Sequence, residues 1–119
     1  MTYNYHQINY RVMIDTVRRI RENADLTAAV KNSVQFQYMV AEEDTVELPA
    51  MAPAATNYLV SGKRSFEAAR GYIGKKTAVL NYANSHSVGG APFSAGAQEE
   101  SLCRCSTLYP CLKAMEQSF

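Results

Sequence analysis

The sequence lacks a surplus of charge, a long apolar run and an even set of cysteines, and each absence narrows its function. Twelve Lys and Arg stand against eleven Asp and Glu in 119 residues, a formal net charge of +1. A nearly neutral chain has no field strong enough to hold nucleic acid or an anionic membrane without a local patch. No run reaches the ~18 apolar residues of a membrane span, and the polar start is not typical of a signal peptide.

Cysteine is scarce and odd in number, since Cys103, Cys105 and Cys111 are the only three. A disulfide framework is not expected, so we predict a reducing, cytoplasmic location. Zinc would need a fourth ligand such as His86, but two thiols in Cys-x-Cys on a helix point about 200° apart. A Cys–His nucleophile pair lacks a third, orienting group. We therefore predict no metal and no cofactor, and thiols that act as small buried hydrophobes.

The composition is that of one folding domain, with 47% hydrophobic and 19% charged residues and no repeat or long linker. Helical spacing of apolar residues predicts a helix over residues 5–23, with its arginines on a solvated face. Asp25 is predicted to be the N-cap of a second helix. Residues 1–33 then form a helical N-terminal region. The apolar positions that carry the first helix are Tyr10, Met13, Ile14, Val17 and Ile20.

The middle of the chain changes its periodicity. Residues 34–40 alternate between apolar and polar, which favours a strand, although the second helix could continue into them. Residues 42–53 carry acids, prolines and small residues, and predict a surface loop.

A strand–helix–strand pattern follows. Residues 56–60 and 77–83 have the composition of strands, and a helix opening at Ser65 lies between them and is stopped by Gly74. Strand, helix and strand within ~27 residues make a βαβ unit, which implies a parallel sheet covered on both faces and a right-handed crossover.

A glycine-containing loop over residues 84–97 leads into a helix that begins at Gln98 and that Pro110 should kink or end. Ligands gather beyond the carboxyl ends of strands in such sheets, and Gly89-Gly90 would let the main chain approach a phosphate. A glycine pair is also an ordinary turn, and acids in a first helical turn are favoured by the helix dipole by ~0.3–1 kcal/mol each. Acids beside a phosphate site would instead serve general-acid chemistry.

These residues resemble the catalytic segment of poly(ADP-ribose) glycohydrolases, in which three glycines are followed six to eight residues later by Gln-Glu-Glu. Here the glycine triplet is incomplete, because Val88 or Ala91 replaces one glycine. Residues 61–69 and 101–110 look like the microbial-type branch, and the match runs from about Asn57 to Leu112. The segments that carry the resemblance are Ala83-Asn84, Val88-Gly89-Gly90-Ala91 and Gln98-Glu99-Glu100.

The resemblance implies an α/β fold, the three-layer α/β/α sandwich of a macrodomain. Residues 1–119 would be a single partial catalytic domain, with the βαβ unit, the catalytic loop and the helix in residues 56–117. We expect the chain to hold the N-terminal part of the sandwich, with further strands and the adenine-contacting segments downstream.

The resemblance also implies the roles of individual residues. Glu100 would be the acid/base, with Glu99 beside it. Helical-wheel geometry instead places Glu99 nearer the buried side, so the residues alone leave the choice open. Ribose and diphosphate would be bound by Asn84, Gln98, Gly89 and Gly90.

The implied reaction is hydrolysis of the ribose–ribose O-glycosidic bond in poly(ADP-ribose), which releases ADP-ribose without a metal. The partner would be ADP-ribose or its polymer, including polymer on modified proteins. Two alternatives remain: a non-catalytic ADP-ribose-binding macrodomain fragment, and a hydrolase of mono-ADP-ribosyl groups.

Overall fold

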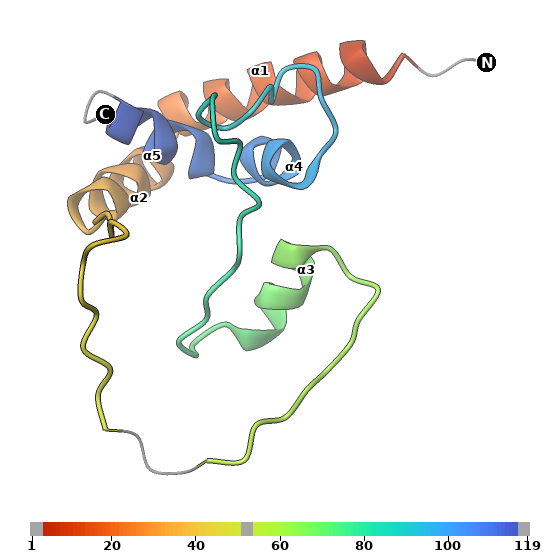
Figure 1. The fold of residues 1–119 in the computed structure, drawn as a ribbon. Helices are drawn as coiled ribbons and strands as arrows, with labels where there is room; N and C mark the ends of the chain where they lie inside the picture. The colour runs from red at the N-terminus through yellow and green to blue at the C-terminus, as the bar shows by residue number, and fades with distance from the viewer. Residues whose placement is uncertain (1–3, 51–53, 117–119) are drawn as a thin grey trace. The chain divides into compact units, whose positions relative to one another are not determined.

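The computed structural model describes residues 4–50 and 54–116, which divide into two compact units. Of the described residues, 4–37 and 80–116 form the helical unit, and 38–50 and 54–79 form the second unit. The helical unit contains α1 (Tyr5–Glu22), α2 (Ala24–Gln35), α4 (Gln98–Arg104) and α5 (Leu108–Met115) (Figure 1). The second unit contains α3 (Ser65–Ala69) and the 3₁₀ helix η1 (Arg70–Tyr72).

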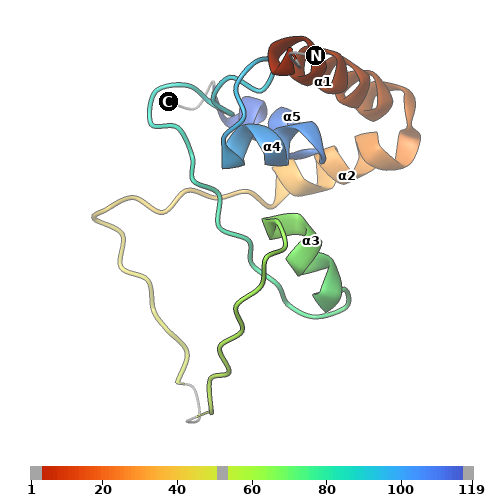
Figure 2. The same cartoon turned by 90° about the vertical axis from the view of Figure 1, so that its right-hand side faces the viewer.

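The predicted α/β fold is wrong for the described residues, which contain helices and no β-strand. Residues 56–60 and 77–83, both predicted strands, run without regular secondary structure (Figure 2). A strand forms only where its backbone groups pair with a neighbour. No such ladder exists in the described ranges, and most of the apolar side chains of these two segments stay exposed. The βαβ unit, the parallel sheet and the three-layer α/β/α sandwich are therefore absent from this part of the chain.

The alternating segment differs from the predicted strand, whereas the described part of the acidic segment is the predicted loop. The second helix continues to Gln35, as the alternative interpretation of residues 34–40 allowed, and the rest of that segment is irregular. Residues 42–50 form the predicted loop, whereas residues 51–53 of the same prediction lie outside the described residues. That the whole chain is one partial domain stays a prediction.

The first predicted helix is confirmed almost to the residue. α1 begins after Asn4, whose side-chain oxygen accepts a hydrogen bond from the Gln7 N–H at 3.3 Å. Its arginines lie on a solvated face, as predicted, because Arg18 and Arg19 form exposed ion pairs with Asp15. These arginines therefore form ion pairs on the exposed surface of α1.

The cap of α2 is Asn23 and not the predicted Asp25. The Asn23 side-chain oxygen accepts from the Leu26 N–H at 3.0 Å, which satisfies one of the unpaired donors at the helix start. Asp25 lies in the first turn of the helix instead. The Thr27 hydroxyl then donates to the Ile20 carbonyl at 2.8 Å and fixes the corner between α1 and α2.

The predicted helix in the second unit is confirmed in both position and end. The Glu67 carboxylate accepts from the Arg64 N–H at 3.0 Å in the first turn of α3. Gly74 has φ +84°, a left-handed conformation that glycine adopts without steric cost, and the chain leaves the helix there.

The core of the helical unit lies where α1 and α5 pack against α2 and α4. The Thr16 hydroxyl donates to the Arg104 carbonyl at 2.6 Å and ties α1 to the end of α4. The break between α4 and α5 comes at residues 105–107, ahead of the break predicted at Pro110. Pro110 lies in the first turn of α5, where a backbone N–H would have no intrahelical partner, so its missing N–H costs the helix no hydrogen bond. The buried apolar side chains of the described core are Met13, Leu102, Cys103 and Cys111.

None of the helices in the described ranges combines the length and the apolar character needed to cross a membrane.

Candidate active site

The Gln-Glu-Glu motif occupies the first turn of α4, which begins at Gln98 as predicted. Glu99 is 3% exposed and Glu100 is 7% exposed, so both carboxyl groups are buried and Glu99 is slightly the more buried, the order that the helical wheel predicted. Glutamate is seldom this buried unless its carboxyl group has partners. The hydrogen bonds of the two side chains therefore carry the information about the site.

Both oxygens of Glu99 accept hydrogen bonds from the segment that leads into the loop. The Asn81 side-chain amide donates to one oxygen at 3.1 Å, and the Asn84 backbone N–H donates to the other at 2.8 Å. Glu99 thereby attaches residues 81–84 to the start of α4.

Glu100 is bonded through one oxygen only. Its Oε1 accepts from the Ala91 backbone N–H at 3.2 Å, while its Oε2 is buried and has no hydrogen-bond partner among the described residues. A buried polar atom without a partner is rare and is one of the features that mark catalytic and binding sites. This oxygen can give a proton to, or take one from, a bound ligand.

The two loop glycines are required by both conformation and space. Gly89 has φ +76° and Gly90 has φ +63°, values that L-residues rarely adopt. A Cβ on Gly90 would collide with the Glu100 carboxylate, and a Cβ on Gly89 would lie 2.8 Å from Cδ2 of Tyr109. Within the described ranges no other residue type has positive φ, so neither Val88 nor Ala91 stands where glycine is needed.

The two side chains predicted to bind ribose, those of Asn84 and Gln98, form hydrogen bonds with backbone groups in this structure. The Asn84 side-chain oxygen accepts from the His86 N–H at 2.8 Å and from the Ser87 N–H at 2.9 Å, an Asx-type turn. His86 is exposed there, as expected of a surface loop residue.

The Gln98 side chain forms hydrogen bonds with the backbone of the two residues that flank Asn81. Its amide accepts from the Tyr82 N–H at 2.9 Å and donates to the Leu80 carbonyl at 2.8 Å, the pair of bonds that a neighbouring strand would otherwise make. That Asn84 and Gln98 contact ribose stays a prediction.

Comparison with known families decides the class of the protein. A family model described as the microbial-type PARG (poly(ADP-ribose) glycohydrolase) catalytic domain matches residues 5–119. The chain belongs to this family. The resemblance drawn from the loop and helix is thus confirmed, and the match also includes α1. A search of curated proteins and a search of solved structures each found no significant match.

Three polar residues of this candidate site were not predicted from the sequence to contribute to it. Asn81 holds Glu99, and its own side-chain oxygen is buried without a hydrogen-bond partner among the described residues. An Asn inside an otherwise apolar segment was the available signal. Asn9 and Arg104 donate to loop carbonyls from α1 and from the end of α4, and no local pattern pointed to either contact.

Phe93 packs against aromatic rings of two helices. Its ring lies 6.0 Å from the Tyr10 ring and 6.1 Å from the Tyr109 ring, centroid to centroid. It therefore joins the loop of the PARG-family site to α1 and α5.

The cysteines next to the site are mostly buried. Cys103 and Cys111 behave as predicted, whereas Cys105 is exposed. Burial, and then the negative charges of Glu99 and Glu100, raise the pKa of Cys103 to about 11. In the described part of the PARG-family chain, no three His, Cys, Asp or Glu side chains gather closely enough to hold a metal ion.

Proposed function

We propose that the chain hydrolyses the ribose–ribose O-glycosidic bond of poly(ADP-ribose) and releases ADP-ribose, with Glu100 as the general acid and base. The observation that carries the proposal is the unequal bonding of two adjacent buried carboxyl groups. Glu99 has both oxygens occupied by N–H donors, while Glu100 keeps one buried oxygen for chemistry. Membership of the PARG family supports the reaction class.

In the proposed mechanism one carboxyl group acts twice. Glu100 first protonates the leaving ribose oxygen as the glycosidic bond breaks, and the sugar develops oxocarbenium character. The resulting carboxylate then takes a proton from water as that water attacks the anomeric carbon. Two residues adjacent in a helix cannot flank a glycosidic bond as the paired carboxylates of most glycosidases do. A single acid/base beside a positioning carboxylate suits this geometry.

The neighbouring residues position the substrate in this proposal. Glu99, Asn84 and Gln98 orient the ribose, and Gly89 and Gly90 let the backbone approach the diphosphate because no Cβ intervenes. The partner is ADP-ribose or its polymer, and no cofactor takes part. A cytoplasmic location belongs to this proposal, because three cysteines do not favour a disulfide framework.

Glu100→Gln tests the proposal, since it keeps the side-chain shape and removes the exchangeable acid. We expect release of ADP-ribose from poly(ADP-ribose), followed by chromatography, to fall by a factor of about 10² to 10⁴. ADP-ribose binding measured by calorimetry should persist. Glu22→Gln, on the exposed face of α1 beside Arg18, is the matched control and should keep full activity.

The outcomes separate the three candidate functions. Full activity of Glu100→Gln would show that another group is the acid. Binding of ADP-ribose by the unaltered chain without release from any substrate would identify a binding module. Release only from mono-ADP-ribosylated protein would identify a mono-ADP-ribosyl hydrolase.

A further inference from the structure

The residues that follow the glycine pair form a tight turn, residues 91–95, whose own hydrogen bonds are few. The Ala91 carbonyl accepts from the Ser94 N–H at 3.0 Å and from the Ala95 N–H at 2.9 Å. The Ala91 N–H, at the start of the same turn, donates to Glu100. The location of this turn therefore determines where the bonded oxygen of Glu100 lies.

Arg104 holds the far side of the turn. One guanidinium nitrogen, Nη1, donates to the Pro92 carbonyl at 2.8 Å and to the Ala95 carbonyl at 2.6 Å. These are charge-assisted bonds, stronger than those between neutral groups. Arg104 stands four residues after Glu100, so α4 contacts the turn from two successive helical turns.

Asn9 on α1 holds the turn from a second helix. Its side-chain amide donates to the Ser94 carbonyl at 2.9 Å and to the Ala95 carbonyl at 3.3 Å. The Ala95 carbonyl thus accepts from both Arg104 and Asn9. The contacts bridge more than eighty residues of sequence.

We propose that Arg104 and Asn9 are positioning residues for the general acid, and that they act through the turn of residues 91–95 and the Ala91 N–H. The proposal rests on the proposed function of Glu100. Without the two clamps, the turn would lose its hydrogen bonds to Asn9 and Arg104 and keep the packing of Phe93 and the buried Pro92. The Ala91 N–H would then no longer be fixed, and Glu100 would lose its only hydrogen-bond donor among the described residues.

Arg104→Ala and Asn9→Ala test the clamp, with Arg104→Lys as the conservative variant and Thr27→Val as the control. Thr27 also bonds a backbone carbonyl within the helical unit, that of Ile20, but it does not touch the turn. We expect kcat for ADP-ribose release to fall about ten- to hundredfold in each alanine variant. Arg104→Lys should recover most of the loss, because a single nitrogen makes both contacts. Thr27→Val should keep the kcat of the unaltered chain.

Amide hydrogen exchange at Ala91, measured by NMR, distinguishes a positioning role from a role in overall stability. A change in overall stability would alter exchange throughout the helical unit and not at Ala91 alone. We expect exchange at Ala91 to speed up in both alanine variants while amides in the middle of α1 keep their protection. Unchanged exchange at Ala91, or a loss of kcat only in proportion to a fall in Tm that Thr27→Val shares, would overturn the proposal.

The design separates this proposal from that of the general acid. If the unaltered chain releases no ADP-ribose, the proposed function fails, and Ala91 exchange alone decides whether the clamp exists. If Arg104→Ala does not fold, Asn9→Ala and Arg104→Lys give the same comparison.

Discussion

Glu99 and Glu100 are neighbours in the chain, yet their carboxyl groups have different partners. Glu99 accepts from a side-chain amide and from a backbone N–H of residues 81–84, whereas Glu100 accepts only from the Ala91 N–H. A helical wheel does not predict these hydrogen-bond partners, because they come from the segment and the loop that precede the helix. At the residue scale, the hydrogen-bond partners distinguish the two carboxyl groups.

Gly90→Ala should disable the site without unfolding the unit. A Cβ at this position meets the Glu100 carboxylate, and the positive φ costs a further ~1–2 kcal/mol for an L-residue. We expect kcat to fall at least about tenfold, because a displaced acid is a poor proton donor. Gly96→Ala is the control, since no atom lies within 4 Å of a Cβ there and its φ is not positive. Equal activity of the two variants would contradict this geometry.

Cys103 should be protected from alkylation at neutral pH. Its pKa of about 11 means that few molecules carry the reactive thiolate at pH 8, and that this fraction rises roughly tenfold per pH unit up to about 11. Iodoacetamide, read out by mass spectrometry of peptides, should label the exposed Cys105 first. Glu99→Gln removes one of the two negative charges that raise the pKa, so Cys103 should then react faster at a given pH. Labelling of Cys103 before Cys105 at pH 8 would refute this.

At the scale of elements, the helices and the strands depend on different information. α1 and α3 begin and end where local signals place them, because helical hydrogen bonds join residues four apart in the chain. Residues 56–60 and 77–83 have strand composition, but strand pairing needs a partner distant in sequence. Composition alone therefore predicted strands that do not form in the described part of the chain.

Asn23→Ala should destabilise the helical unit by about 1 kcal/mol, the usual cost of losing an N-cap. The Asn23 side chain bonds the Leu26 N–H, and alanine leaves that donor without its cap. Asp25→Ala is the comparison, because a first-turn acid contributes only ~0.3–1 kcal/mol through the helix dipole. Urea unfolding followed by circular dichroism measures both. A larger loss for Asp25→Ala would restore Asp25 as the cap.

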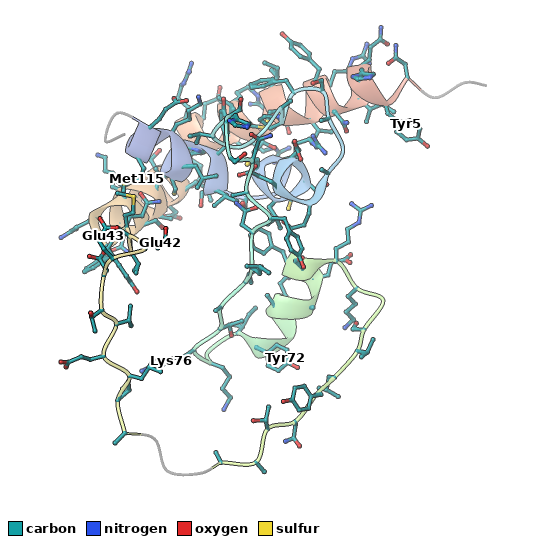
Figure 3. All side chains as sticks on the ribbon, viewed as in Figure 1. Tyr5, Glu42, Glu43, Tyr72, Lys76 and Met115 are labelled. Atoms are coloured by element: carbon teal, nitrogen blue, oxygen red, sulfur yellow. The ribbon has the colours of Figure 1, made fainter. Side chains whose placement is uncertain are left out.

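At the scale of the whole molecule, the two units differ in how many of their side chains are buried. The helical unit holds all the buried apolar side chains of the described residues. Many side chains of the second unit are exposed, among them Glu42, Glu43 and Lys76, which are labelled in Figure 3. Local opening costs little where few apolar contacts are lost.

Limited trypsin digestion should therefore cut the second unit first. Lys63 and Arg64 are exposed and precede α3, outside any helix, whereas Arg18 and Arg19 lie within α1 and pair with Asp15. We expect cleavage at Lys63 and Arg64 to be roughly tenfold faster than at Arg18 or Arg19, as measured by mass spectrometry of early fragments. Early cleavage within α1 would contradict the assignment of the stable unit.

The sequence by itself determined the family, the start of α4, the extent of α1 and the candidate residues of the site. Each of these depends on a motif or on contacts close in sequence. The tertiary structure alone decided that both glutamates are buried, that Glu100 but not Glu99 keeps an oxygen without a hydrogen-bond partner among the described residues, and that Asn9 and Arg104 hold the loop. The structure also showed that the strands predicted for residues 56–60 and 77–83 do not form. The physical reason is the same in each case: hydrogen bonds between residues far apart in the chain leave no periodic signal in it.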